Sequence, residues 1–200
     1  LVGDFLYSRA FQMMVDIGDM KVMRILANAT NTIAAGEVMQ LMNVHDPDTT
    51  EHDYQQVIYR KTARLFEAGA QIAAVLAKRD SGDEAAMIKY GQHLGTAFQL
   101  IDDALDYDAS ADELGKNIGD DLAEGKATLP LIQAMNAGSD AERELIRTAI
   151  LTGGLEQLDQ IQAIIRSTGA LDYTVAKARE AADAAIAVLA ELPANEYRQA

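Results

Sequence analysis

Residues 98–107 read FQLIDDALDY, and this stretch decides how the rest of the chain is interpreted. Asp102 and Asp106 are four residues apart and Asp103 and Asp106 are three apart, so a helix would bring all three carboxylates to one face. Like charges at this spacing disfavour a helix by roughly 0.2–0.5 kcal/mol per pair, unless a cation neutralises them. Carboxylate oxygens suit Mg²⁺ or Ca²⁺, and Mg²⁺ commonly adds substrate phosphate oxygens. The stretch therefore predicts a helical face that holds magnesium-bound diphosphate.

Apolar residues recur at helical spacing on both sides of this stretch, almost throughout the 200 residues. Alanine, leucine, isoleucine and methionine dominate, and only 3 prolines interrupt the pattern. No segment is typical of a strand. We expect an all-α chain with one helical domain over residues 1–200. Its helices are expected at about 2–15, 21–42, 54–78, 84–107, 129–137, 141–151, 155–167 and 171–192.

The charge and the cysteine count exclude several classes of function. A net charge of −14 argues against nucleic-acid binding, because phosphate requires Lys and Arg to replace its counterions. The absence of cysteine excludes disulfides, thiol catalysis and cysteine-ligated zinc. No apolar run approaches the length of a membrane span, and no signal peptide is recognisable. We expect a cytoplasmic protein that binds no nucleic acid and does not insert stably into a membrane.

Basic residues lie where a diphosphate could be met. Arg60, Lys61 and Arg64 share one side of the helix expected at 54–78, whereas Lys116 and Lys126 each follow a glycine in the polar segment after the aspartates. Metal-bound diphosphate needs cations for the oxygens that the metal does not cover, and lysine supplies a mobile point charge. One lysine alone indicates only a solvated surface, so the order of these residues around the aspartates carries the interpretation.

Two of these patterns also have plainer interpretations. The DDxxD string alone would suit a solvated acidic face near the end of a helix. His45, Asp46, Asp48 and His52 could ligate a metal, but the stretch is polar and contains Pro47, which favours a solvent-exposed loop.

The wider set of residues resembles the trans-prenyl diphosphate synthase family. Residues 98–106 are similar to the second aspartate-rich motif of that family. Further similar strings occur in the family's order over about the first 130 residues: Val2-Gly-Asp-Phe-Leu, Gly36-Glu37 with Gln40, Lys61-Thr62-Ala-Arg-Leu-Phe66, Leu114-Gly-Lys116-Asn, Gly119-Asp-Asp and Gly125-Lys126-Ala-Thr-Leu-Pro130. The chain looks most like the long-chain bacterial members of octaprenyl type, which make the ubiquinone side chain.

The resemblance implies a fold, an activity and residue roles. The fold would be of the isoprenoid synthase type, with antiparallel helices around a central cavity. The activity would be a Mg²⁺-dependent prenyltransferase that condenses isopentenyl diphosphate with an allylic diphosphate, in a homodimer. The metal would be held by Asp102, Asp103 and Asp106, and the allylic diphosphate would be contacted by Lys61, Lys116 and Lys126. Thr62 and Gln99 would lie beside the reacting carbons. Phe98 would pack under the site, and Glu37 and Gln40 would face the cavity.

The chain also departs from the family pattern. The first aspartate-rich motif and the arginine pair that follows it do not occur, and there is no second DDxxD string. In the family these lie upstream of the segment similar to Val2–Phe5, so we expect the chain to lack the N-terminal part of the domain. Two alternatives follow, a non-catalytic subunit of a heteromeric prenyl synthase and a class I terpene cyclase. The Lys61-Thr62 pair and the Gly125–Pro130 string favour chain elongation over cyclisation.

Overall fold

The structure is a computed structural model that describes residues 1–108, 118–190, 192, 194 and 198, and within these residues every regular element is helical. The all-α prediction is therefore confirmed. The elements are α1 (Val2–Ile17), α2 (Met20–Asn43), α3 (Glu51–Ile58), a π-helical turn (Tyr59–Ala63), α4 (Arg64–Leu76), α5 (Ser81–Leu105), α6 (Asp120–Ala123), α7 (Leu129–Ala137), α8 (Asp140–Thr152), a 3₁₀ turn (Leu155–Gln157), α9 (Leu158–Ser167) and α10 (Ala170–Leu189).

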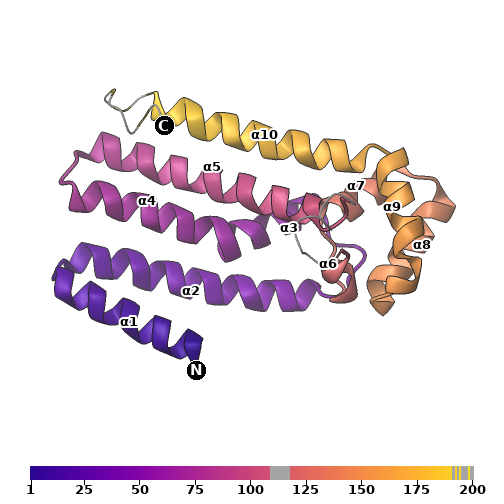
Figure 1. The fold of residues 1–200 in the computed structure, drawn as a ribbon, viewed down its shortest axis with the longest axis horizontal. Coiled ribbons are helices and arrows are strands. Elements are labelled where there is room, and N and C mark those ends of the chain that lie inside the picture. Colours follow the sequence, from indigo (N-terminus) through magenta and orange to yellow (C-terminus); the bar gives the residue numbers. More distant parts are fainter. Residues whose placement is uncertain (109–117, 191, 193, 195–197, 199–200) are drawn as a thin grey trace.

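The long helices lie side by side in one array. Figure 1 shows the order α1, α2, α4, α5 and α10 across this array, and the contacts between α2 and α4, α4 and α5, and α5 and α10 agree with it. The short helices α6 to α9 gather at one end of the array (Figure 1). α5 is thus flanked on both sides, and its C-terminal end points toward the short helices, where the aspartates lie.

Local sequence explains where these helices begin and end. The Asp80 side chain accepts hydrogen bonds from the backbone N–H groups of Gly82 and Asp83 and caps α5. Thr50 and Asp53 form a capping box at the start of α3. α8 ends at Gly153, which adopts a φ of +66° that favours glycine. Such caps are short-range features, so the predicted boundaries agree closely with the observed ones.

The predicted helix over 54–78 is the main exception. It consists of three joined segments, because a π-helical turn at Tyr59–Ala63 separates α3 from α4. A π turn inserts one residue into a continuous helix and needs neither glycine nor proline. Across the turn the buried positions Ile58 and Ala63 are five residues apart instead of three or four, and this offset of one residue was not recognised in the sequence. The polar segment after the aspartates also contains the short helix α6.

The main core joins the short helices to the ends of α3 and α5. Leu129, Leu131, Ile146 and Ile161 are fully buried in it, and Tyr107, just after α5, lies among them. This packing anchors the end of α5 that carries the aspartates.

α1 is different, because Met14 is its one buried residue among the described residues and large apolar side chains such as Phe5 are exposed. None of the described helices combines the length and the hydrophobicity that crossing a bilayer would require.

Candidate functional site

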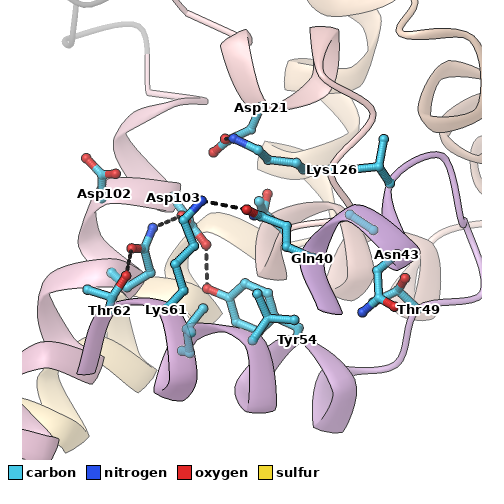
Figure 2. A pocket seen from close by; sticks show the side chains of 16 residues that line it. Gln40, Asn43, Thr49, Tyr54, Lys61, Thr62, Asp102, Asp103, Asp121 and Lys126 are labelled. Carbon is cyan, nitrogen blue, oxygen red and sulfur yellow. Dashed lines mark hydrogen bonds and ion pairs between the residues drawn. The ribbon is translucent and has the colours of Figure 1, made fainter. Parts of the chain in front are cut away.

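A cavity of about 220 Å³ lies between α2, α3 with the π turn, the last turns of α5 and the segment after α6. Of the residues predicted from the sequence, it brings together Gln40, Lys61, Thr62, Gln99, Asp102, Asp103 and Lys126. It is also lined by polar residues for which the sequence predicted no role, namely Asn43, Thr49, Tyr54, Asp121 and Thr128. Residues from four separate parts of the chain thus converge on one site (Figure 2).

The π turn carries Lys61 and Thr62 to the cavity. Turns of this kind are frequent at functional sites, because the inserted residue changes which side chains face inward. Two glycines allow neighbouring helices to approach it closely. A Cβ at Gly36 would lie 2.9 Å from the backbone nitrogen of Lys61, and a Cβ at Gly95 would lie 2.6 Å from Cα of Ala63. Glycine is therefore required on both α2 and α5 for this packing.

A chain of hydrogen bonds runs from the π turn to the aspartates. The Thr62 hydroxyl donates to Oε1 of Gln99 at 2.7 Å, and Nε2 of Gln99 donates to Oδ1 of Asp103 at 2.7 Å. The Tyr54 hydroxyl donates to Oδ2 of Asp103 at 2.5 Å (Figure 2). These bonds set the orientation of the Gln99 amide. They also occupy each carboxylate oxygen of Asp103, which is buried, whereas Asp102 is partly exposed in the cavity.

The carboxylates create an excess of negative charge in a buried setting. Burial raises the pKa of Asp103 to about 7, and the charge of Asp121 adds to the shift, while the hydrogen bond from Tyr54 opposes it. Burial also raises the pKa of Asp106 to about 6, again with a contribution from Asp121. A divalent cation would stabilise the ionised forms of these groups, and hard carboxylate oxygens suit Mg²⁺. The residues present therefore fit a bound cation.

The described residues contain no ready-made cage for such an ion, because no three His, Cys, Asp or Glu side chains among them are arranged to hold one. Asp106 follows α5 as its C-cap residue and accepts a hydrogen bond from the backbone N–H of Asp121 at 3.3 Å. It does not line the cavity. A cation at this site would consequently need further oxygen ligands, and substrate phosphate oxygens are the usual source for Mg²⁺.

Two lysines reach the cavity from different elements. Nζ of Lys61 donates to Oε1 of Gln40 at 2.5 Å and lies 3.4 Å from Oε1 of Glu37. Nζ of Lys126 lies 2.9 Å from Oδ1 of Asp121 and 2.6 Å from Oε2 of Glu124. Burial lowers the pKa of Lys126, but the two carboxylates raise it by more, so the ammonium stays charged. Both cations are held in place by acceptors that an anionic ligand could replace (Figure 2).

Besides Asp106, three predicted residues lie away from the cavity or outside the described part of the chain. Phe98 packs its ring against Phe66, with 5.5 Å between ring centroids, and remains 55% exposed outside the cavity lining. Glu37 contacts Lys61 but is not among the lining residues. Lys116 falls outside the described residues. The proposed roles of these three residues stay predictions.

The sequence contains one indication that Tyr54 contacts a polar group. This residue lies in the apolar pattern of the helix expected at 54–78, and a buried tyrosine hydroxyl usually finds a hydrogen-bond partner. The sequence could therefore have indicated that Tyr54 meets a polar group, although not which one.

His45 proves to be a structural contact in a loop, because its backbone N–H donates to the carbonyl of Gly125 and its ring Nδ1 lies 2.8 Å from the carbonyl of Ile150.

Comparison with known proteins gives consistent matches. The model of the polyprenyl synthetase family matches residues 1–168. Octaprenyl diphosphate synthase of Escherichia coli (strain K12) is 53% identical over 201 residues, which is 100% of this chain and 62% of that protein. The all-trans-nonaprenyl-diphosphate synthase (geranyl-diphosphate specific) of Rhodobacter capsulatus is 50% identical over 200 residues, covering 100% of this chain and 61% of that protein.

The fold has close counterparts among solved structures. Polyprenyl synthase from Caulobacter crescentus CB15, complexed with calcium and isoprenyl diphosphate, superposes with a TM-score of 0.93 at 45% identity. The match covers 99% of this chain and 61% of that one. This chain thus spans about three fifths of the length of the relatives that it matches.

Proposed function

This chain belongs to the polyprenyl synthetase family, and we propose that it carries one diphosphate and metal half-site of a trans-prenyl diphosphate synthase. The proposed reaction joins isopentenyl diphosphate to an allylic diphosphate and yields a long-chain polyprenyl diphosphate. One observation carries the proposal: Lys61, Lys126 and the acidic pair Asp102–Asp103 converge on a single cavity. The octaprenyl and nonaprenyl synthases among the relatives support a long-chain product.

The side chains of the site suit the binding of a diphosphate. Lys61 and Lys126 would exchange their present acceptors for oxygens of the allylic diphosphate, and Lys116 would supply a third cation. Asp102 and Asp106, with Asp103 behind them, would hold Mg²⁺. When bound, the metal would neutralise the charge of the leaving diphosphate. Glu37 and Gln40 would keep Lys61 oriented toward the cavity.

The same geometry suits the formation of an allylic cation. In the proposed reaction the allylic C–O bond breaks, the double bond of isopentenyl diphosphate forms the new C–C bond, and a proton is then lost. The oxygens of Thr62 and Gln99 are preorganised by their mutual hydrogen bond, so they cost no reorganisation when positive charge develops beside them. Phe98 would pack under the site.

Calorimetry of this chain tests the proposal. Mg²⁺ and an unreactive allylic diphosphate analogue are titrated into the wild-type chain, Asp102→Ala and the control Asp172→Ala, which removes an exposed carboxylate from α10. We expect magnesium-dependent binding by the wild type and the control, and at least tenfold weaker binding by Asp102→Ala. Equal binding by all three chains would contradict the assignment of Asp102.

Product analysis separates the alternatives. A terpene cyclase would consume an allylic diphosphate alone, whereas an elongating synthase also requires isopentenyl diphosphate. The alternative of a non-catalytic subunit is motivated by the occurrence of one DDxxD string among these 200 residues. Full activity of the protein purified by itself would exclude that alternative.

Several finer properties also form part of the proposal. We infer Mg²⁺ as the working metal, and repeating the titration with Ca²⁺ tests this choice. We infer a homodimer that covers the exposed apolar side chains of α1, among them Val2, Phe5 and Leu6. Light scattering measures the mass in solution, and a monomer at all concentrations would contradict a dimer. A role in making the ubiquinone side chain and a cytoplasmic location stay predictions from the family resemblance.

A further inference from the structure

A polar cluster outside the cavity lining spans the π turn. Nη1 of Arg64 lies 2.6 Å from Oε1 of Glu67, and the hydroxyl of Tyr59 donates to Oε2 of Glu67 at 3.1 Å. The side chains of Arg64 and Glu67 are only 13% and 12% exposed. A carboxylate this deeply buried is tolerated when it is paired and hydrogen-bonded, as it is here. No step of the proposed reaction uses this cluster.

The contact between Tyr59 and Glu67 depends on the π turn. Tyr59 is the first residue of that turn, and Glu67 follows eight residues later in α4. At about 100° per residue, eight steps of regular α-helix would place the two side chains about 80° apart around the axis. A π turn takes up roughly one additional residue. The separation then equals about seven α-helical steps, within about 20° of two full turns, so both side chains reach one face.

The same turn sets the rotation of α3 relative to α4. Tyr54 in α3 reaches Asp103, and Thr62 within the turn reaches Gln99. Conversion of the turn to regular α-helix would rotate the preceding residues by roughly 100° relative to α4. That rotation would break both hydrogen bonds. A contact that forms only in the π register therefore favours the register in which the cavity is assembled.

The chemistry of the cluster allows the hydrogen bond between Tyr59 and Glu67 to persist at neutral pH. Burial raises the pKa of the Tyr59 phenol, and the nearby Glu67 carboxylate raises it further. Tyr59 thus remains a hydrogen-bond donor at neutral pH. Arg64 compensates the charge of Glu67, so the carboxylate can accept the bond from Tyr59 without being left as an isolated buried charge.

We propose that Glu67 is a positioning residue, which stabilises the π turn by its contacts with Tyr59 and Arg64. The turn in this form keeps Thr62 hydrogen-bonded to Gln99 and keeps Lys61 in the cavity. The consequence for ligand binding rests on the proposed function. The positioning itself does not, because it can be observed in the protein without ligand.

The test compares wild type with Tyr59→Phe, Glu67→Gln and the double variant. Glu180→Gln is the matched control, because Glu180 forms an ion pair of the same i,i+3 spacing with Lys177 on the exposed surface of α10. Hydrogen exchange of the backbone amides of residues 59–64 and the NMR resonances of the Gln99 side-chain amide are measured without ligand. Affinity for inorganic pyrophosphate with Mg²⁺ is measured by calorimetry.

We expect at least tenfold faster exchange at 59–64 and a shifted Gln99 amide in Tyr59→Phe and Glu67→Gln, with neither change in Glu180→Gln. Pyrophosphate affinity should fall about fivefold. The effects in the double variant should be less than additive, because Tyr59→Phe removes the donor to Glu67 and Glu67→Gln leaves one acceptor oxygen for both Tyr59 and Arg64. Tyr59→Phe loses only a hydroxyl, so it keeps the test valid if Glu67→Gln does not fold.

If Tyr59→Phe changes neither the hydrogen-exchange rates at 59–64 nor the resonances of the Gln99 side-chain amide, the proposed stabilisation of the π turn by Glu67 is wrong. Faster exchange with an unshifted Gln99 amide and full pyrophosphate affinity would overturn the positioning role. A wild-type chain that does not bind magnesium pyrophosphate would instead contradict the proposed function, while the exchange and the Gln99 resonance would still decide the inference.

Discussion

The hydroxyl of Tyr54 donates a 2.5 Å hydrogen bond to Asp103 across a separation of 49 residues in the sequence. Both side chains are buried, with 5% of Tyr54 and 3% of Asp103 exposed. The bond ties α3 to the acidic end of α5. Asp103, the middle aspartate of the DDxxD string, is thereby buried, whereas its neighbour Asp102 is partly exposed in the same cavity.

Removal of the Tyr54 hydroxyl should destabilise the protein. Tyr54→Phe leaves an oxygen of a buried carboxyl group without its donor, so the free energy of unfolding should fall by about 1–3 kcal/mol. Urea denaturation measures the change. Tyr7→Phe, at an exposed position in α1, is the control and should change stability by less than about 0.5 kcal/mol. Equal stability of Tyr54→Phe and the wild type would show that the bond contributes nothing.

Asp103 should make the stability of the metal-free protein depend on pH. Its pKa is raised to about 7 in the folded state, so between about pH 4 and 7 the folded protein holds a proton that the unfolded chain has lost. Its contribution to stability is therefore greatest below pH 4, falls as pH rises toward 7, and is then constant. The total effect is at most about 4 kcal/mol.

Denaturation at a series of pH values in the presence of a chelator measures this effect. The variant Asp103→Asn does not titrate, so its stability should decline less between pH 4 and 7 than that of the wild type. The comparison between the two cancels carboxylates with lowered pKa values, such as Glu84, whose contribution is lost on acidification. Parallel curves for the two proteins would contradict a raised pKa of Asp103.

Two glycines should respond oppositely to alanine. A Cβ at Gly95 would lie 2.6 Å from Cα of Ala63, so Gly95→Ala should push α5 away from the π turn and lower the free energy of unfolding by about 1–3 kcal/mol. Gly69 in α4 has no atom within 4 Å of its Cβ position. Gly69→Ala should raise stability by about 0.5–1 kcal/mol. Thermal unfolding of both variants checks the prediction, which fails if both change stability in the same direction.

The hydroxyl of Thr62 should matter more than its methyl group. Thr62→Val keeps the shape but leaves Oε1 of Gln99 without its donor, at a cost of about 1 kcal/mol in stability. If the proposed reaction holds, kcat should also fall about tenfold, because the Gln99 amide is no longer preorganised. Thr62→Ser retains the hydroxyl and should stay close to wild type. Steady-state condensation assays with isopentenyl diphosphate compare the three proteins, and equal loss in both variants would point to packing instead.

The sequence by itself determined the fold class and most helix limits. Apolar spacing and caps act within a few residues of one another, so local patterns sufficed to predict α7 at 129–137 and α5 within about three residues. The same local spacing placed Asp102, Asp103 and Asp106 at one end of a helix, and the order of Lys61, the aspartates and Lys126 pointed to a diphosphate site.

Only the tertiary structure decided which of these residues pair with one another. The pairing of Tyr54 with Asp103 and of Thr62 with Gln99 depends on which faces of distant helices meet. Those faces are set by the π turn, which rotates α3 relative to α4 and shifts the apolar spacing by only one residue between Ile58 and Ala63. A shift of one residue within a continuous helical pattern could fall at several positions, and the packing of the π turn and α4 against α5 decides where it lies.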